Sequence, residues 1–170
     1  MAPSIESLEA ELHEMRQLIT TVMRSSSDQG FVVEFLRNSF TLENYEQVAD
    51  TLIKQLANKE LEASVLITTE QGRLLSKQNQ PSESAFDFIY KHRHAGRIVE
   101  QSPLCLINYD HISLLISNMP EDEALQGSLR DLLATLLEAA DAKVQALHHK
   151  AHVSRLQKSK DEFYMIMSHE

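Results

Sequence analysis

The sequence predicts an α+β domain, in which an antiparallel sheet of about five strands carries helices on one face and is held between two long helices. Three patterns predict this fold class. Apolar residues near the N-terminus recur at steps of three and four, those in the middle of the chain alternate at steps of two, and a helical pattern returns after Pro120. We therefore divide the chain into an N-terminal coiled-coil helix (1–25), a central domain (28–140) and a C-terminal helix (141–170).

The N-terminal segment carries the a/d pattern of a coiled coil, which predicts a helix that pairs with another helix. The alternative is a surface helix that packs on its own domain. The pattern predicts a homodimer through these seam residues and through the C-terminal helix. The N-terminal seam residues are Ile5, Leu8, Leu12, Met15, Ile19 and Val22.

Two further helices are expected before the sheet. The polar run at residues 25–30 interrupts the seam, so we expect a break there and a second, short helix from Phe31 to Phe40. Residues 41–44 then provide an N-cap, with Thr41 as the capping side chain, for a third helix that ends near Asn58.

The middle of the chain has the alternation of β-strands. A hairpin is expected from residue 63 to residue 75, with its turn at residues 70–72. A short helix around residues 86–90 follows, and three more strands are expected at 97–101, 104–108 and 111–117. Hairpin connections of this kind make the sheet mainly antiparallel.

The last predicted element is a helix that begins after the acidic turn at residues 119–122 and continues past Lys160. Such a helix has roughly 45 residues and a length of about 68 Å. A domain of this size cannot cover it all, so its C-terminal half must project, pair with a second copy, or fray.

Composition excludes several classes of partner. The 16 basic and 25 acidic residues give a formal charge of −9, which repels nucleic acid and anionic membrane surfaces. The single cysteine, Cys105, has no partner for an internal disulfide, so we expect a cytoplasmic protein with Cys105 as a small core residue on a strand. No stretch of the sequence is apolar for the roughly 18 residues that a membrane helix needs.

The expected order of elements resembles a GAF domain more than a PAS domain. The segments Gly30–Phe40 and Ser113–Pro120 are similar to the GAF-like region that follows receiver domains in some bacterial response regulators. The resemblance implies a non-catalytic sensory and dimerisation module of a two-component system, with other signalling domains as partners and no bound cofactor.

The last eleven residues, Lys160–Glu170, resemble the H-box of histidine kinases. The resemblance implies that His169 accepts a phosphoryl group in a phosphorelay, that Glu170 is its neighbouring base, and that Phe163 and Met167 lie on the buried face of a dimerisation helix. The alternative is a chance match of eleven residues. Two other functions therefore stay open, namely the N-terminal part of a sensor histidine kinase and a ligand-free dimeric scaffold.

Other clusters give weaker signals. The histidines at 148, 149 and 152 have helical spacing for a divalent metal, but a solvated helix face is the preferred interpretation and no metal is expected. The run His92-Arg93-His94 follows a helix near the place where GAF domains hold ligands, so it is either a site for an anionic ligand or an ordinary surface loop. We find no nucleotide-binding loop or catalytic constellation in residues 30–120, and we expect no ATP binding or hydrolysis by this chain alone.

Overall fold

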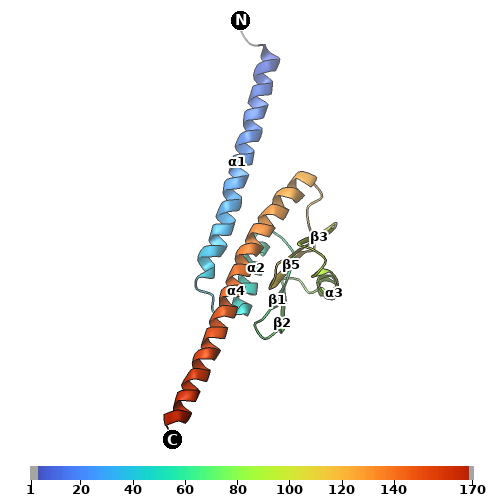
Figure 1. Ribbon diagram of the computed structural model, residues 1–170. Helices are drawn as coiled ribbons and strands as arrows, with labels where there is room; N and C mark the ends of the chain where they lie inside the picture. Colours follow the sequence, from blue (N-terminus) through green and yellow to red (C-terminus); the bar gives the residue numbers. More distant parts are fainter. Residues whose placement is uncertain (1–3, 169–170) are drawn as a thin grey trace.

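The computed structural model describes residues 4–168, apart from the side chains of residues 17–25. In this part of the chain, four helices and five strands form one small domain crossed by two long helices (Figure 1). The elements are α1 (Ile5–Ser39), α2 (Tyr45–Ala57), β1 (Ala63–Thr68), β2 (Leu74–Gln78), α3 (Glu83–His92), β3 (Ile98–Gln101), β4 (Leu104–Asn108), β5 (Ile112–Ile116) and α4 (Glu123–Ser168). The α+β class is confirmed.

The five strands form one antiparallel sheet in the order β2-β1-β5-β4-β3. The sequence-adjacent pairs β1–β2, β3–β4 and β4–β5 are hairpins, as the turn residues predicted. The pairing of β1 with β5 closes the middle of the sheet, where Val65 lies opposite Leu114. The three inner strands, β1, β5 and β4, are the most buried ones, because each has a neighbouring strand on both edges and helices above it.

Both faces of the sheet are covered, which corrects the expectation of helices on one face. The first face packs against α1, α2 and α4, and its strand residues include Val65, Ile107 and Leu114. The second face carries α3, which packs Ala85 and Ile89 onto residues such as Leu106 and Leu115. Because the central strands are apolar on both sides, one layer of helices is not enough to bury them.

The N-terminal helix is one continuous element, so the predicted break at residues 25–30 is wrong. The polar run contains no proline, and Gly30 costs only about 1 kcal/mol inside a helix. Contacts after Gly30 hold the helix in place: Phe35 is fully buried, and Gln55 Nε2 donates a hydrogen bond of 2.5 Å to the carbonyl of Phe31. Tertiary packing therefore overrides the local preference for a turn.

The connection to α2 also differs in detail. Asn44, and not Thr41, is the N-cap of α2, because its side chain accepts a hydrogen bond of 2.9 Å from the Gln47 amide. The Thr41 hydroxyl instead donates to the carbonyl of Asn38 in the last turn of α1. Thr41 thus completes the end of one helix and Asn44 begins the next.

The C-terminal helix α4 has 46 residues, which confirms the prediction of a helix that continues past Lys160. Asp122 accepts a hydrogen bond from the Leu125 amide at its start. Buried residues line one side of the helix as far as Leu147, and beyond that point the side chains are almost all exposed. The described part of the chain contains no helix that is long and apolar enough to cross a membrane.

Candidate functional site

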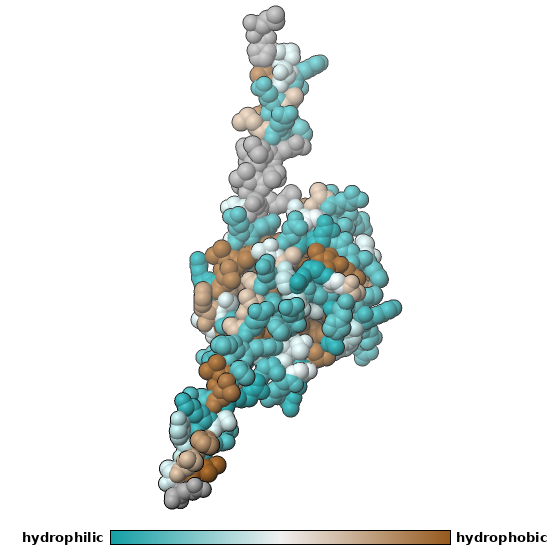
Figure 2. Space-filling model, viewed as in Figure 1, coloured by the Kyte–Doolittle hydropathy of each residue, from teal (hydrophilic) through white to brown (hydrophobic). Residues whose placement is uncertain are grey.

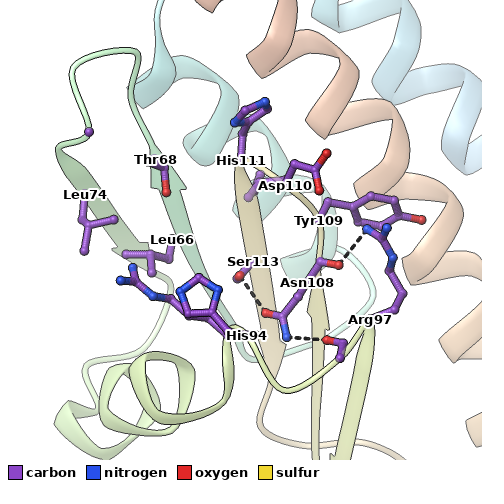
Figure 3. Close-up of a pocket in the computed structure, with 14 residues that line it drawn as sticks. Leu66, Thr68, Leu74, His94, Arg97, Asn108, Tyr109, Asp110, His111 and Ser113 are labelled. Atoms are coloured by element: carbon purple, nitrogen blue, oxygen red, sulfur yellow. Dashed lines mark hydrogen bonds between the residues drawn. The ribbon is translucent and has the colours of Figure 1, made fainter.

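A hollow of about 600 Å³ opens on the second face of the sheet, beyond the C-terminal end of α3 (Figure 3). Three connections surround it: the β1–β2 turn, the α3–β3 loop and the β4–β5 turn. Its floor is formed by strand residues of mixed character, including Leu66, Asn108 and Ser113. This volume lies within the usual range for small-molecule sites.

Asn108, at the end of β4, holds the α3–β3 loop against the sheet. Its Nδ2 donates to the carbonyls of His92 and Gly96 at 3.2 and 2.8 Å, and its Oδ1 accepts from the Ser113 hydroxyl at 2.8 Å. The backbone of Asn108 pairs with Arg97, whose Nη1 donates to the Asn108 carbonyl at 2.8 Å. Asn108 is buried with every polar atom of its side chain in use, so its role is to shape the loop.

The walls of the hollow carry more basic than acidic groups. Arg93 and His94 lie on the α3–β3 loop, Arg97 directly precedes β3, and Asp110 and His111 lie in the β4–β5 turn. Figure 3 shows His94 on the α3–β3 loop at the edge of the hollow, while the guanidinium of Arg97 stacks over the Tyr109 ring with Cζ 3.9 Å from its centroid. In a chain of net charge −9, this is a local concentration of cationic groups suited to an anion.

The structure places two of the three residues of the predicted anionic site at the hollow. Arg93 and His94 line it, whereas the ring of His92 packs on Phe88 with 4.4 Å between centroids. Sequence reasoning missed Arg97 and Asn108. The feature that could have indicated both is the pairing of β3 with β4, because it places Asn108 opposite Arg97 at the end of the α3–β3 loop.

The β4–β5 turn links the hollow to α4. The Tyr109 hydroxyl donates to the Ala134 carbonyl at 3.1 Å, and the His111 amide donates to the Asp141 carboxylate at 2.9 Å. Asp141 is buried and accepts a second hydrogen bond from Gln145. Burial, together with the Glu138 carboxylate, raises the pKa of Tyr109. A displacement of this turn would therefore also displace the residues of α4 to which it is hydrogen-bonded.

A second cluster lies where α4 leaves the domain. His148 Nε2 donates to the Thr68 carbonyl at 2.8 Å, and its ring centroid is 4.5 Å from that of His111 and 5.6 Å from that of Tyr45. The Tyr45 hydroxyl donates to the Glu70 carboxylate, which lowers the pKa of Glu70. Burial, with a further contribution from this hydrogen bond, raises the pKa of Tyr45 to about 12.

The expected solvated face at the three C-terminal histidines is correct for His149 and His152, which are exposed, but not for His148, which is half-buried in this cluster. Local spacing could not reveal the partner, since Thr68 lies 80 residues away. No group of three or more His, Cys, Asp or Glu side chains among the described residues is arranged to hold a metal ion.

The predicted seam residues of α1 are exposed in the single chain. Ile5, Leu8, Leu12 and Met15 retain between 49% and 75% of their accessible surface, and the side chains of Ile19 and Val22 lie outside the described residues. The far end of α4 is similar, with Val153, Leu156, Phe163 and Met167 at 49% to 59%. Figure 2 shows hydrophobic side chains on both projecting parts.

The remaining predicted residues divide into two groups. His169 and Glu170 lie outside the described residues, although α4 runs to Ser168 directly before them. Cys105 is a core residue as expected, because it is buried on β4 against the helices of the first face. Burial raises the pKa of its thiol to about 11.

The projecting helices and the hollow are thus two features of the described residues that the packing of a single chain does not explain. The hollow offers cationic groups around an open volume, and the helices offer apolar seams that one chain leaves uncovered. Comparisons of the chain with protein-family models, with curated proteins and with solved structures find no match.

Proposed function

We propose that this chain is a non-catalytic sensory and dimerisation module of a bacterial two-component signalling protein, built on a GAF-like domain. The observation that carries the proposal is the arrangement of α1 and α4. They cross the domain side by side and leave it at opposite ends, each with exposed apolar residues at a/d spacing (Figures 1 and 2). A helix of this kind is stabilised by a partner helix and not by water.

A parallel pair of chains would cover the exposed apolar residues of α1 and of α4 at the same time. If two copies are related by an axis along the helices, Leu8 and Leu12 of α1 meet their counterparts at one end, and Val153 and Leu156 of α4 meet theirs at the other. In an antiparallel pair, the projecting part of α1 in one chain would lie against the domain or against the projecting part of α4 of the other chain. We therefore propose parallel pairing, which is also the arrangement that transmits a signal along the helices.

The proposed mechanism is mechanical. An event at the hollow, either ligand binding or contact with a neighbouring domain, moves the β4–β5 turn. Because Tyr109 and His111 of this turn are hydrogen-bonded to Ala134 and Asp141, the movement shifts the packing of α4. Packed helices have a few discrete arrangements, so a small shift is passed on along the pair without chemistry at the domain.

Light scattering of the whole chain over a range of concentrations tests the dimer. We expect a dimer, and we expect Leu8→Lys combined with Leu12→Lys to weaken it, because each pair of seam lysines adds like charges in place of apolar contacts. Ser7→Lys with Ala10→Lys is the matched control, since it adds the same charge at exposed positions away from the seam. A wild-type chain that stays monomeric at high micromolar concentration would refute the proposal.

A second, dependent proposal concerns the hollow. The presence of Arg93, His94 and Arg97 around about 600 Å³ favours an anionic ligand with a phosphate or carboxylate group. Titration with inorganic pyrophosphate and with AMP, followed by NMR of the histidine rings, tests it. We expect saturable shifts that are lost in Arg93→Gln with Arg97→Gln and kept in Lys150→Gln with Arg155→Gln, two exposed positions on α4.

The phosphorelay part of the proposal rests on the resemblance of Lys160–Glu170 to an H-box. His169 is then the phosphoacceptor and Glu170 its neighbouring base, and both follow directly in the sequence after α4. A chain that continues past Glu170 should gain acid-labile phosphate from ATP and a histidine-kinase catalytic domain, and His169→Gln should abolish the label. Label that persists in His169→Gln would mean that the resemblance is chance.

A further inference from the structure

The apolar seam of α1 continues beyond Gly30 on an exposed side of the helix. Starting from Ile5, the alternating steps of three and four run through residues 8, 12, 15, 19, 22, 26 and 29 without a change of phase. Since the helix is unbroken from Ile5 to Ser39, the next positions in the same register are Val33, Leu36 and Phe40. The apolar seam thus resumes on the part of α1 that belongs to the domain.

These three side chains are exposed although they are large and apolar. Val33 keeps 49%, Leu36 42% and Phe40 85% of its accessible surface. They occupy about 60° of the helix circumference, and the buried Phe35 lies at least about 100° away from each of them, toward the domain core. One side of α1 therefore holds the domain, and a different side presents the seam to the solvent.

We propose that a second copy of this chain covers Val33, Leu36 and Phe40, so that the dimer interface runs along the whole of α1 and includes the domain itself. This inference rests on the proposed dimer and extends it. The register of the seam indicates a second copy. A helix surface that repeats every seven residues is complementary to a helix with the same repeat, and α1 of the second copy is such a helix in the same phase. The drift of about 20° per heptad on a straight helix is removed when the two helices coil around each other.

Two polar residues, Ser26 and Gln29, occupy seam positions between the apolar ends, and both are exposed. Polar residues at such positions reduce the stability of a coiled coil and restrict its register. The pair of α1 helices is then held firmly at two places, near Leu8 to Met15 and near Val33 to Phe40. The helical turn that contains Ser26 and Gln29 is therefore the weakest part of this interface.

Disulfide cross-linking of the whole chain tests the extended interface. Met15→Cys and Leu36→Cys occupy equivalent d positions at the two ends, and Glu34→Cys is the matched control, since it is exposed and at least about 100° from every residue of the Val33–Phe40 seam. The wild-type chain gives the background because Cys105 is buried. We expect mild oxidation to link both d-position variants as dimers, and to link Glu34→Cys no faster than the wild type.

The outcomes separate this inference from the dimer proposal. If Met15→Cys is linked but Leu36→Cys reacts no faster than Glu34→Cys, the interface stops before the domain and the inference is wrong while the dimer stands. If neither d-position variant is linked in a chain that light scattering shows to be dimeric, parallel pairing through α1 is wrong. If the wild type is monomeric, both proposals fail.

The strength of the association gives an independent measurement. Leu36→Gln combined with Phe40→Gln should raise the dissociation constant by about tenfold or more, because an aromatic residue and its neighbour in the seam lose their contacts across the pair. Glu34→Gln should leave the dissociation constant unchanged. Circular dichroism checks that the double variant is folded, and an unchanged dissociation constant in the folded double variant would overturn the inference.

Discussion

The two faces of the sheet differ in what they contribute. On the face toward α1, α2 and α4, the described strands present a continuous apolar layer that is sealed by helices. On the face toward α3, a small cluster of five buried residues stands beside polar strand ends and an open hollow. The first face stabilises the domain and fixes the long helices, whereas the second face is only partly closed and leaves room for a ligand.

The difference arises between neighbouring residues of the same strands. Ile107 and Ile112 point into the first core, while Asn108 and Ser113, next to them in the chain, hydrogen-bond to each other on the second face. Successive side chains of a strand point to opposite faces of the sheet, so neighbouring residues can serve different faces without any change in the backbone. The following predictions test the comparison, beginning with the largest expected effect.

Leu114 and Leu115 are adjacent, fully buried and on opposite faces. Leu114→Ala should lower the free energy of unfolding by about 3–5 kcal/mol, because the surrounding helices leave a cavity that cannot collapse. Leu115→Ala should cost less, about 2–3 kcal/mol, since fewer groups surround it and α3 can move inward. Urea denaturation of both variants measures the difference, and equal costs would contradict the proposed inequality of the faces.

Asp141 connects the two faces, because it is buried on α4, which packs on the first face, and it accepts a hydrogen bond from the amide of His111 at the rim of the hollow. Asp141→Ala should cost about 1–3 kcal/mol, since it leaves this amide without its acceptor. Asp141→Asn is the control, because its amide oxygen can still accept the hydrogen bond. Urea denaturation and amide exchange at His111 would show the effect, and equal loss in the two variants would mean that charge, and not the hydrogen bond, is what matters.

Asn108→Ala should act mainly on the hollow. It removes the side-chain hydrogen bonds to the carbonyls of His92 and Gly96, so the α3–β3 loop should lose protection from hydrogen exchange, with a stability loss of about 1–2 kcal/mol. Residues of the first face should keep their protection. A uniform loss across the whole domain would show that Asn108 supports the entire fold and not this loop alone.

The smallest effect concerns Tyr45, at the exit of α4. Its folded pKa of about 12 lies above the ordinary value of 10.0, so the neutral phenol is favoured in the folded state. The sign follows from proton linkage: this contribution is fully present below pH 10 and is lost as the pH rises toward 12. Tyr45→Phe should lose less stability than the wild type over that window, which denaturation at a series of pH values would detect.

Several elements could be predicted from the sequence because the signals for them are local. The alternation in residues 63–68 and 112–116, the turn at residues 70–72 and the leucine pattern after residue 123 determine strands, hairpin and long helix wherever they lie. The apolar spacing in Ile5–Met15 also belongs to the sequence alone. It predicts a seam whose partner the single chain does not contain.

Tertiary structure decided the remainder, because it depends on residues far apart in the chain. Local preference favoured a break near Gly30, whereas α1 is continuous and is held to the domain by the burial of Phe35 and the hydrogen bond from Gln55 to Phe31. His148 belongs to a solvated face by spacing, yet the Thr68 carbonyl draws it into a cluster at the exit of α4. The sequence by itself thus determined the elements and their apolar faces. Packing between distant segments decided which faces meet and which polar groups surround the hollow. The physical reason is that the energies of these tertiary contacts exceed the helix propensities, which differ by only about 1 kcal/mol or less per residue.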